Sequence, residues 1–285
     1  MTGPDLPRLR RALRPRTVLR AIAIGWLIFW WIWLQSQLGR SPEYDADGYW
    51  GFALGDLYTG TQLGDRGAFL YSPLVAWLFA PFSALPYPAF YALLSGVNLI
   101  ALTWMLGWEL AAVSLFALPV SNEIARGNIH LLLAAAIVAG MRWPAAWAWV
   151  LLTKVTPGIG LAWFAFRREW RNLAVAIGVT GALVGIGFAI DPDLWTRWFT
   201  MLGTNVDAAP QTPIFEIPVL PRLAVAGAII GLAAWRDRPA VIPVAAMLAL
   251  PAVWVNSLAM LVACWPIWRM QRAAGPSPDP DVAAS

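Results

Sequence analysis

The chain has 285 residues, of which 59% are hydrophobic and 13% charged, and its formal net charge is +4. An ordinary globular domain is about 45–50% apolar and about 25% charged, so the composition excludes a soluble domain and indicates a polytopic membrane protein. One histidine and one cysteine cannot form a zinc site of His and Cys ligands, a disulfide framework or a CxxC redox pair.

The first predicted element is an apolar helix over 21–34, preceded by a cluster of arginines. A signal peptide begins similarly, but no small-residue cleavage site follows, which favours an uncleaved first transmembrane helix. Later apolar segments approach the length of about 20 residues that a span needs, and they predict an all-α transmembrane helical bundle of about ten spans. These segments are 72–86, 88–106, 108–121, 128–141, 143–166, 172–190, 219–235, 239–254 and 255–269.

The arginines are distributed unevenly between the two sides that this count defines. The positive-inside rule then predicts a multi-pass protein of the plasma membrane with both termini in the cytoplasm and Arg126 on the cytoplasmic side. In a membrane protein, an excess of basic over acidic residues usually reflects membrane orientation and contact with lipid head groups. Membrane lipids are therefore expected as partners, and nucleic acid is not. Two long loops, 39–71 and 191–218, fall outside. The first is rich in aromatic residues and is expected to form short interfacial amphipathic helices.

We expect a single transmembrane domain over residues 1–272. The remaining residues, 273–285, contain several prolines and no apolar run. Their composition predicts a disordered C-terminal tail.

A pair of acidic residues, Asp45 and Asp47, follows the first predicted span within the sequence Asp-Ala-Asp-Gly-Tyr. A carboxylate among aromatic side chains suits a general base, because apolar surroundings raise its pKa toward the working pH. Asp45 is the first candidate for this role and Asp47 the second. The alternative, that both acids are simply solvated in an outer loop, is the more common situation for such a pair.

The next cluster is Phe-Leu-Tyr-Ser-Pro-Leu over 69–74. The residue before a proline is biased out of helical conformation, whereas proline is favoured in the first turn of a helix. Pro73 is therefore predicted to begin a helix, and the physical pattern alone indicates nothing more than that.

Lys154, the only lysine, lies in the middle of an apolar segment. A lysine at the centre of a span costs roughly 2.5–3.5 kcal/mol on insertion scales, so it needs a partner or a function. An ion pair with Glu109 or Glu123 would satisfy it, but a lysine beside a proline-interrupted helix also suits a phosphate ligand. Glu123 and Arg126 are spaced to pair on one helix, and His130 is expected to be a satisfied core histidine.

In this order, the clusters resemble glycosyltransferase family 87, the polyprenyl-phosphate-mannose-dependent mannosyltransferases of the GT-C superfamily. The resemblance covers roughly residues 18–200. At two positions the chain departs from the family pattern, because Asn128 and His130 stand where relatives have Gln and Asn, and its C-terminal half is shorter than in typical members. The matching positions are Asp45, Tyr49, Gly55, Leu57, Tyr58, Phe69, Tyr71, Pro73, Leu74, Pro81, Leu85, Pro86, Gly127, Lys154, Pro157 and the loop 167–170.

The resemblance implies a GT-C-like fold and transfer of a hexose, expected to be mannose, from a polyprenyl-phosphate donor. The acceptor would be a glycolipid or polysaccharide on the outer membrane face, and the configuration at the sugar would be inverted. Asp45 would deprotonate the acceptor, and Lys154, with Arg66 and Arg126, would hold the donor phosphate. Because the topology places Arg126 inside, its role requires a re-entrant segment over 108–141.

Four further side chains are expected to bind substrate, and neither a metal ion nor another cofactor is expected. The main alternative is a non-catalytic relative that binds or translocates lipid-linked sugars. An ion-coupled transporter ranks last, because Lys154 is the one charged residue clearly in mid-span. The expected substrate-binding residues are Tyr49, Tyr71, Asn128 and His130.

Overall fold

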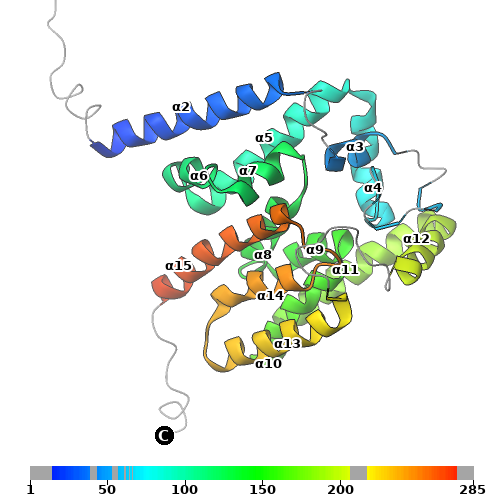
Figure 1. Cartoon of the computed structure of the whole chain (residues 1–285). Coiled ribbons are helices and arrows are strands. Elements are labelled where there is room, and N and C mark those ends of the chain that lie inside the picture. The colour runs from blue at the N-terminus through cyan, green and yellow to red at the C-terminus, as the bar shows by residue number, and fades with distance from the viewer. Residues whose placement is uncertain are drawn as a thin grey trace, which may run out of the picture.

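The computed structural model describes residues 15–38, 44–52, 57–60, 62, 63, 65, 67–205 and 217–274. Within these ranges all regular secondary structure is helical, as the composition predicts (Figure 1). The elements in chain order are α2 (Pro15–Ser36), α3 (Tyr44–Trp50), α4 (Pro73–Phe79), the 3-10 helix η1 (Ala80–Ala84), α5 (Tyr87–Leu106), α6 (Trp108–Ser114), α7 (Leu118–Ala125), α8 (His130–Gly140), η2 (Pro144–Ala146), α9 (Trp147–Thr153), η3 (Thr156–Leu161), α10 (Ala162–Phe166), α11 (Trp170–Ile190), α12 (Pro192–Asn205), α13 (Val219–Trp235), η4 (Pro239–Val241), α14 (Ile242–Leu248), η5 (Val255–Ala263) and α15 (Cys264–Ala274).

Three of the described helices, α2, α5 and α11, are long and apolar enough to cross a membrane. The pair α7 and α8 would make a fourth span, bent by 110° at its break. The expectation of about ten continuous spans is not confirmed, because several apolar segments divide into short helices. Proline explains many of the breaks: it lacks an N–H and is tolerated only in a first turn, where Pro73 begins α4 as predicted.

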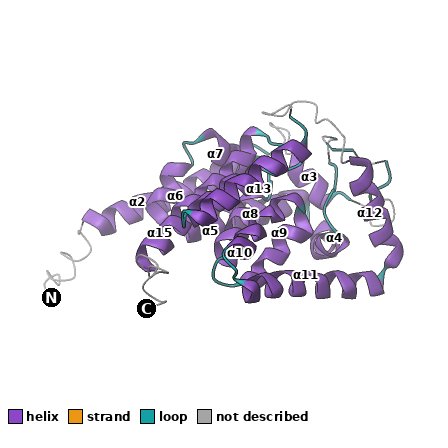
Figure 2. Cartoon of the chain, turned by 90° about the horizontal axis from the view of Figure 1, so that it is seen from below, coloured by secondary structure: helices purple, strands orange, loops and turns teal. Residues whose placement is uncertain are grey.

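The surface of α11 is apolar on nearly all sides. Only Ala176 and Gly187 of this helix are buried, while Ile177, Ile186 and Ile190 are among its exposed side chains. The helix runs along one edge of the molecule (Figure 2). A soluble protein rarely exposes so large a continuous apolar surface, so this edge is suited to contact with lipid hydrocarbon.

The two predicted outer loops meet at one end of the molecule, where both views show α3, α4 and α12 (Figures 1 and 2). The indole N–H of Trp198 donates to the carbonyl of Leu70 at 3.2 Å, and the backbone N–H of Leu63 donates to Asn205 Oδ1 at 2.8 Å. The first loop contains a short helix, α3, as expected. The second loop contains α12, which buries one apolar face.

Buried Arg222 of α13 organises the chain just after α14. Its guanidinium donates to the carbonyls of Leu248, Leu250 and Pro251 at 2.7–2.8 Å. Carbonyl groups in such a non-helical segment would otherwise lack partners. The arginine therefore shapes the backbone that leads into η5, on which α7 and α8 both pack.

The C-terminal helix is longer than the sequence suggests. The disordered tail was expected to begin at residue 273, but α15 continues through Ala274. The rest of the predicted tail, 275–285, lies outside the described residues.

Candidate active site

A cavity of about 850 Å³ lies among α3, the chain before α4, the break between α7 and α8, and the start of η5. Its volume falls in the range of about 300–1,000 Å³ that is usual for small-molecule sites. The wall contains one acid and two cations that the sequence singles out. The sequence-predicted residues on this wall are Asp45, Tyr49, Tyr71, Arg126, Asn128 and Lys154.

Two other predicted site residues, Asp47 and His130, do not line the cavity. Asp47 is half-buried and is not among the side chains that line the cavity. It lies two positions from Asp45, and residues two apart on a helix do not share a face. His130 is buried behind the wall, in contact with Lys154. Arg66 lies outside the described residues.

Helix α3 is fixed against the break between α7 and α8. The backbone N–H of Ala46 donates to the carbonyl of Arg126 at 3.1 Å, and the Ala46 side chain is fully buried. On the same helix, the Tyr49 hydroxyl lies 2.7 Å from the Tyr71 hydroxyl and donates to Asn128 Oδ1 at 3.4 Å. These contacts direct Asp45, one position before Ala46, toward the cavity.

Gly127 permits the close contact between α3 and the break. Its φ is +63°, and a Cβ built at this position would lie 2.6 Å from the Cβ of Ala46. The left-handed conformation alone costs a non-glycine residue roughly 1–2 kcal/mol. The glycine of the predicted Gly-Asn-x-His motif is therefore required by both conformation and space.

Replacement of Gly127 by Ala is expected to destabilise the folded protein by at least about 1–2 kcal/mol, because strain and the Ala46 clash add. Thermal unfolding in detergent would measure the effect as a lower Tm. Gly178→Ala is the matched control, since a Cβ there meets no atom within 4 Å. Equal Tm values for the two variants would contradict this account of Gly127.

A chain of buried hydrogen bonds leads from α7 to the cavity. Glu123 Oε2 lies 2.9 Å from His130 Nδ1, and His130 Nε2 lies 2.8 Å from Lys154 Nζ. Because an ammonium group only donates hydrogen bonds, Nε2 must accept and the imidazole proton resides on Nδ1, facing Glu123. The side-chain amide of Asn256 donates to the same carboxylate oxygen at 2.9 Å.

Lys154 is placed by a local break in the helix. It follows α9 with extended backbone angles, φ −137° and ψ 106°, and η3 begins two residues later. Its ammonium group has three N–H donors. One is engaged by His130 and the side chain lines the cavity, so the remaining donors can serve a ligand there.

The surroundings of Asp45 stabilise the protonated form of its carboxyl group relative to a carboxyl group in water. Burial raises the pKa of Asp45 above its ordinary value and the charge of Glu123 adds to this, whereas the hydrogen bond with Asn128 and the charge of Lys154 act in the opposite direction. Burial also raises the pKa of the Tyr49 phenol well above its ordinary value. Tyr49 therefore stays protonated, while Asp45 can exchange a proton nearer to neutrality.

The partners of Lys154 differ from those expected. Glu109 is not one of them: it lies at the surface, 3.5 Å from Arg20. Glu123 reaches Lys154 only through His130, which is satisfied in the core as predicted but also connects the two charged groups.

Arg126 corrects the predicted topology. The arginine was placed inside and Asp45 outside, but both line one cavity, so these two placements cannot hold together. The expected spans 108–121 and 128–141 put Arg126 in a cytoplasmic loop between them, whereas in the structure α7 and α8 meet at a bend of 110° around this residue. A pair bent in this way is either a broken span or a re-entrant segment, and the re-entrant form is the one that a role for Arg126 requires.

Sequence reasoning named Glu123 only as a possible partner in an ion pair, and it assigned no role in the site to Glu123 or Asn256. Glu123 has no exposed surface, and a carboxylate in an apolar region is a signal for a buried polar network. Asn256 and Ser257 precede the last apolar segment; the Ser257 hydroxyl lies 3.5 Å from His130 Nε2. No local pattern indicates that either residue meets α7 and α8.

Comparisons with known proteins identify the family of this chain. The model of glycosyltransferase family 87 matches residues 69–278, more than half of the chain. It extends further toward the C-terminus than the expected 18–200, and it begins after Asp45. No solved structure matches the chain.

One curated relative is the polyprenol-phosphate-mannose-dependent alpha-(1-2)-phosphatidylinositol mannoside mannosyltransferase of Mycobacterium tuberculosis. It is 23% identical over 199 residues, which cover 57% of this chain and 46% of the relative. The chain thus aligns with less than half the length of that protein.

Proposed function

The chain belongs to glycosyltransferase family 87, and from this premise we propose that it transfers a hexose from a polyprenyl-phosphate donor to a hydroxyl of a glycolipid or polysaccharide. Mannose is the proposed sugar, because the curated relative is named for a polyprenol-phosphate-mannose donor. The observation that carries the proposal is the placement of Asp45 and Lys154 on the wall of one cavity.

The proposed reaction is a single displacement at the anomeric carbon. Asp45 accepts the proton of the acceptor hydroxyl as its oxygen attacks, and the bond from the anomeric carbon to the phosphate oxygen breaks. One attack from the face opposite the leaving group inverts the configuration. The departing polyprenyl phosphate gains negative charge, which the ammonium group of Lys154 stabilises in a partly dehydrated site.

Arg126 supports the same step. Its Nε donates to Asn122 Oδ1 at 2.9 Å, which fixes the guanidinium on the cavity wall. A guanidinium matches the geometry of phosphate oxygens. Arg126 is therefore proposed as a second phosphate ligand. Tyr49, Tyr71 and Asn128 are proposed to contact the sugar.

We propose that the reaction takes place on the outer face of the plasma membrane, with both termini in the cytoplasm. The excess of arginine in the segments assigned to the cytoplasm supports this orientation. A polyprenyl chain is apolar, so it would lie against the exposed surface of the apolar helices while its sugar phosphate enters the cavity.

A second candidate function is binding or translocation of lipid-linked sugars without transfer. The short alignment, 46% of the curated relative, favours this candidate, because the rest of that protein has no counterpart in the match.

An assay of the purified chain in lipid nanodiscs separates the two functions. With radiolabelled polyprenyl-phosphate mannose and a mannosylated glycolipid acceptor, a transferase moves label into the acceptor at a rate proportional to protein. The products are separated by thin-layer chromatography. Donor binding with no labelled product at any acceptor concentration would refute the proposed transfer and leave the second candidate.

A further inference from the structure

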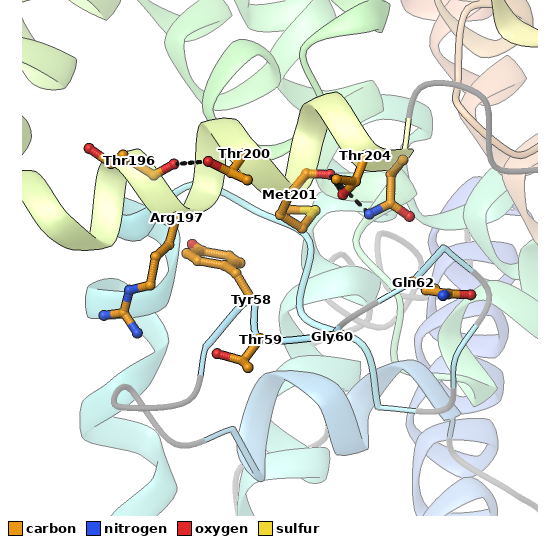
Figure 3. Close-up of a pocket in the computed structure, with 10 residues that line it drawn as sticks. Tyr58, Thr59, Gly60, Gln62, Thr196, Arg197, Thr200, Met201 and Thr204 are labelled. Carbon is orange, nitrogen blue, oxygen red and sulfur yellow. Dashed lines mark hydrogen bonds between the residues drawn. The ribbon is translucent and has the colours of Figure 1, made fainter.

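A second pocket, of about 500 Å³, lies between α12 and the turn at 57–60 (Figure 3). We refer to it as the α12 pocket. Figure 3 shows three threonines along α12 and the Tyr58 ring beneath the helix. The lining residues are Tyr58, Thr59, Gly60, Gln62, Thr196, Arg197, Thr200, Met201, Thr204 and Asn205.

Most of the residues that line the α12 pocket carry a hydroxyl or an amide group. Thr196, Thr200 and Thr204 recur every four residues, so they lie on one face of the helix. Each hydroxyl donates to a backbone carbonyl, that of Pro192, Thr196 or Met201, at 2.9 Å. A hydroxyl oxygen that donates keeps its lone pairs for acceptance. The threonine face can therefore accept hydrogen bonds from the hydroxyls of a sugar.

The opposite wall of the pocket is fixed in an unusual conformation. Tyr58 has a φ of +76°, which a bulky side chain adopts only where its surroundings impose it. Its hydroxyl donates to the carbonyl of Tyr71 at 2.6 Å, and the Tyr71 hydroxyl meets Tyr49 in the cavity. The turn is thus attached to the wall of the candidate active site.

The α12 pocket adjoins the cavity that contains Asp45. Met201 and Asn205 line both spaces. Asn205 is fixed there: its amide donates to the carbonyl of Met201 at 3.0 Å, and its Oδ1 accepts from the N–H of Leu63. A molecule lying along α12 could therefore reach into the cavity past these two residues.

From this arrangement we infer that the α12 pocket binds the non-reacting sugar residues of a neutral glycan acceptor. This inference rests on the proposed transferase function. The donor sugar and phosphate occupy the cavity beside Lys154, so the acceptor needs a separate polar surface from which one hydroxyl reaches Asp45. Side chains that bind only non-reacting sugars set acceptor affinity and selectivity without entering the chemical step.

Two substitutions at exposed Thr200 test this site. Thr200→Trp fills the pocket and is expected to raise the KM for a lipid-linked α-mannobioside acceptor at least about tenfold, while Thr200→Val removes one hydroxyl and raises it about two- to fivefold. The KM for polyprenyl-phosphate mannose is measured in the same experiments and should stay unchanged in both variants. Thr180→Val on α11 is the matched control, because its hydroxyl also donates to a backbone carbonyl, that of Ala176.

Binding of free α-mannobiose to the full chain in nanodiscs, followed by saturation-transfer NMR, provides a readout without turnover. Thr200→Trp should abolish the signal and Thr180→Val should retain it. If the wild-type chain transfers mannose and neither Thr200 variant changes the acceptor KM, the inference fails while the proposed function stands. If no transfer occurs but binding shows this pattern, the proposed function fails and the glycan site stands. If Thr200→Trp binds mannobiose as well as the wild-type chain does, the inference that the α12 pocket binds glycan is also overturned.

Discussion

Replacement of Asp45 by Asn is expected to lower kcat for hexose transfer by about 10²- to 10⁴-fold. The amide has nearly the shape of the carboxylate but cannot accept the acceptor's proton. Because the donor phosphate contacts Lys154 in the proposal and not Asp45, the affinity for polyprenyl-phosphate mannose should change little. Initial rates of radiolabel transfer and equilibrium donor binding, measured on the same nanodisc preparation, check both expectations.

Asp47→Asn distinguishes the two acids of α3. Asp45 lines the cavity, whereas Asp47 is not among the lining residues. We therefore expect Asp47→Asn to retain transfer within a few-fold of wild type. A loss at Asp47 as large as that predicted for Asp45 would show that the wrong carboxylate has been assigned. Substantial activity in Asp45→Asn would remove the general-base proposal altogether.

The features predicted from sequence depend on neighbours in the chain. The helical class follows from composition, Pro73 begins a helix because of its own ring, and an acid flanked by aromatic residues marks α3. Asp45 is recognisable as an acid next to a predicted membrane segment, and Lys154 as a single lysine within one. Both can be identified from sequence without knowing which helices are in contact.

The features that were not predicted depend on contacts between distant segments. Glu123 and Asn256 are 133 positions apart, yet they share a hydrogen bond. The bend between α7 and α8 depends on the fit of Gly127 against Ala46, which hydropathy does not reveal. A hydropathy count also treats short and broken apolar helices as full spans, although such helices can lie inside the protein when neighbours satisfy their backbone groups.

Replacement of Lys154 by Met is expected to lower kcat by about 10²- to 10³-fold, the usual cost of removing one group that stabilises developing charge. Methionine keeps most of the side-chain volume and removes the charge. The second readout is the pH profile. Because the charge of Lys154 lowers the pKa of Asp45, its loss should raise that pKa. The acid limb, where protonation of the base stops transfer, should then move to higher pH.

Glu123→Gln tests whether the hydrogen-bond chain acts through Lys154. Glu123 bonds to His130 and Asn256 and does not itself line the cavity, so it is a positioning residue. Glu123→Gln should lower kcat by about 10- to 100-fold, because the ammonium group of Lys154 is then misplaced. If it acts only along this chain, the double variant Glu123→Gln/Lys154→Met should be no slower than Lys154→Met alone. Multiplicative losses, with a normal Tm in each variant, would mean that Glu123 contributes independently. The Glu123–His130–Lys154 chain would then be structural, and the phosphate role of Lys154 would rest on its place in the cavity alone.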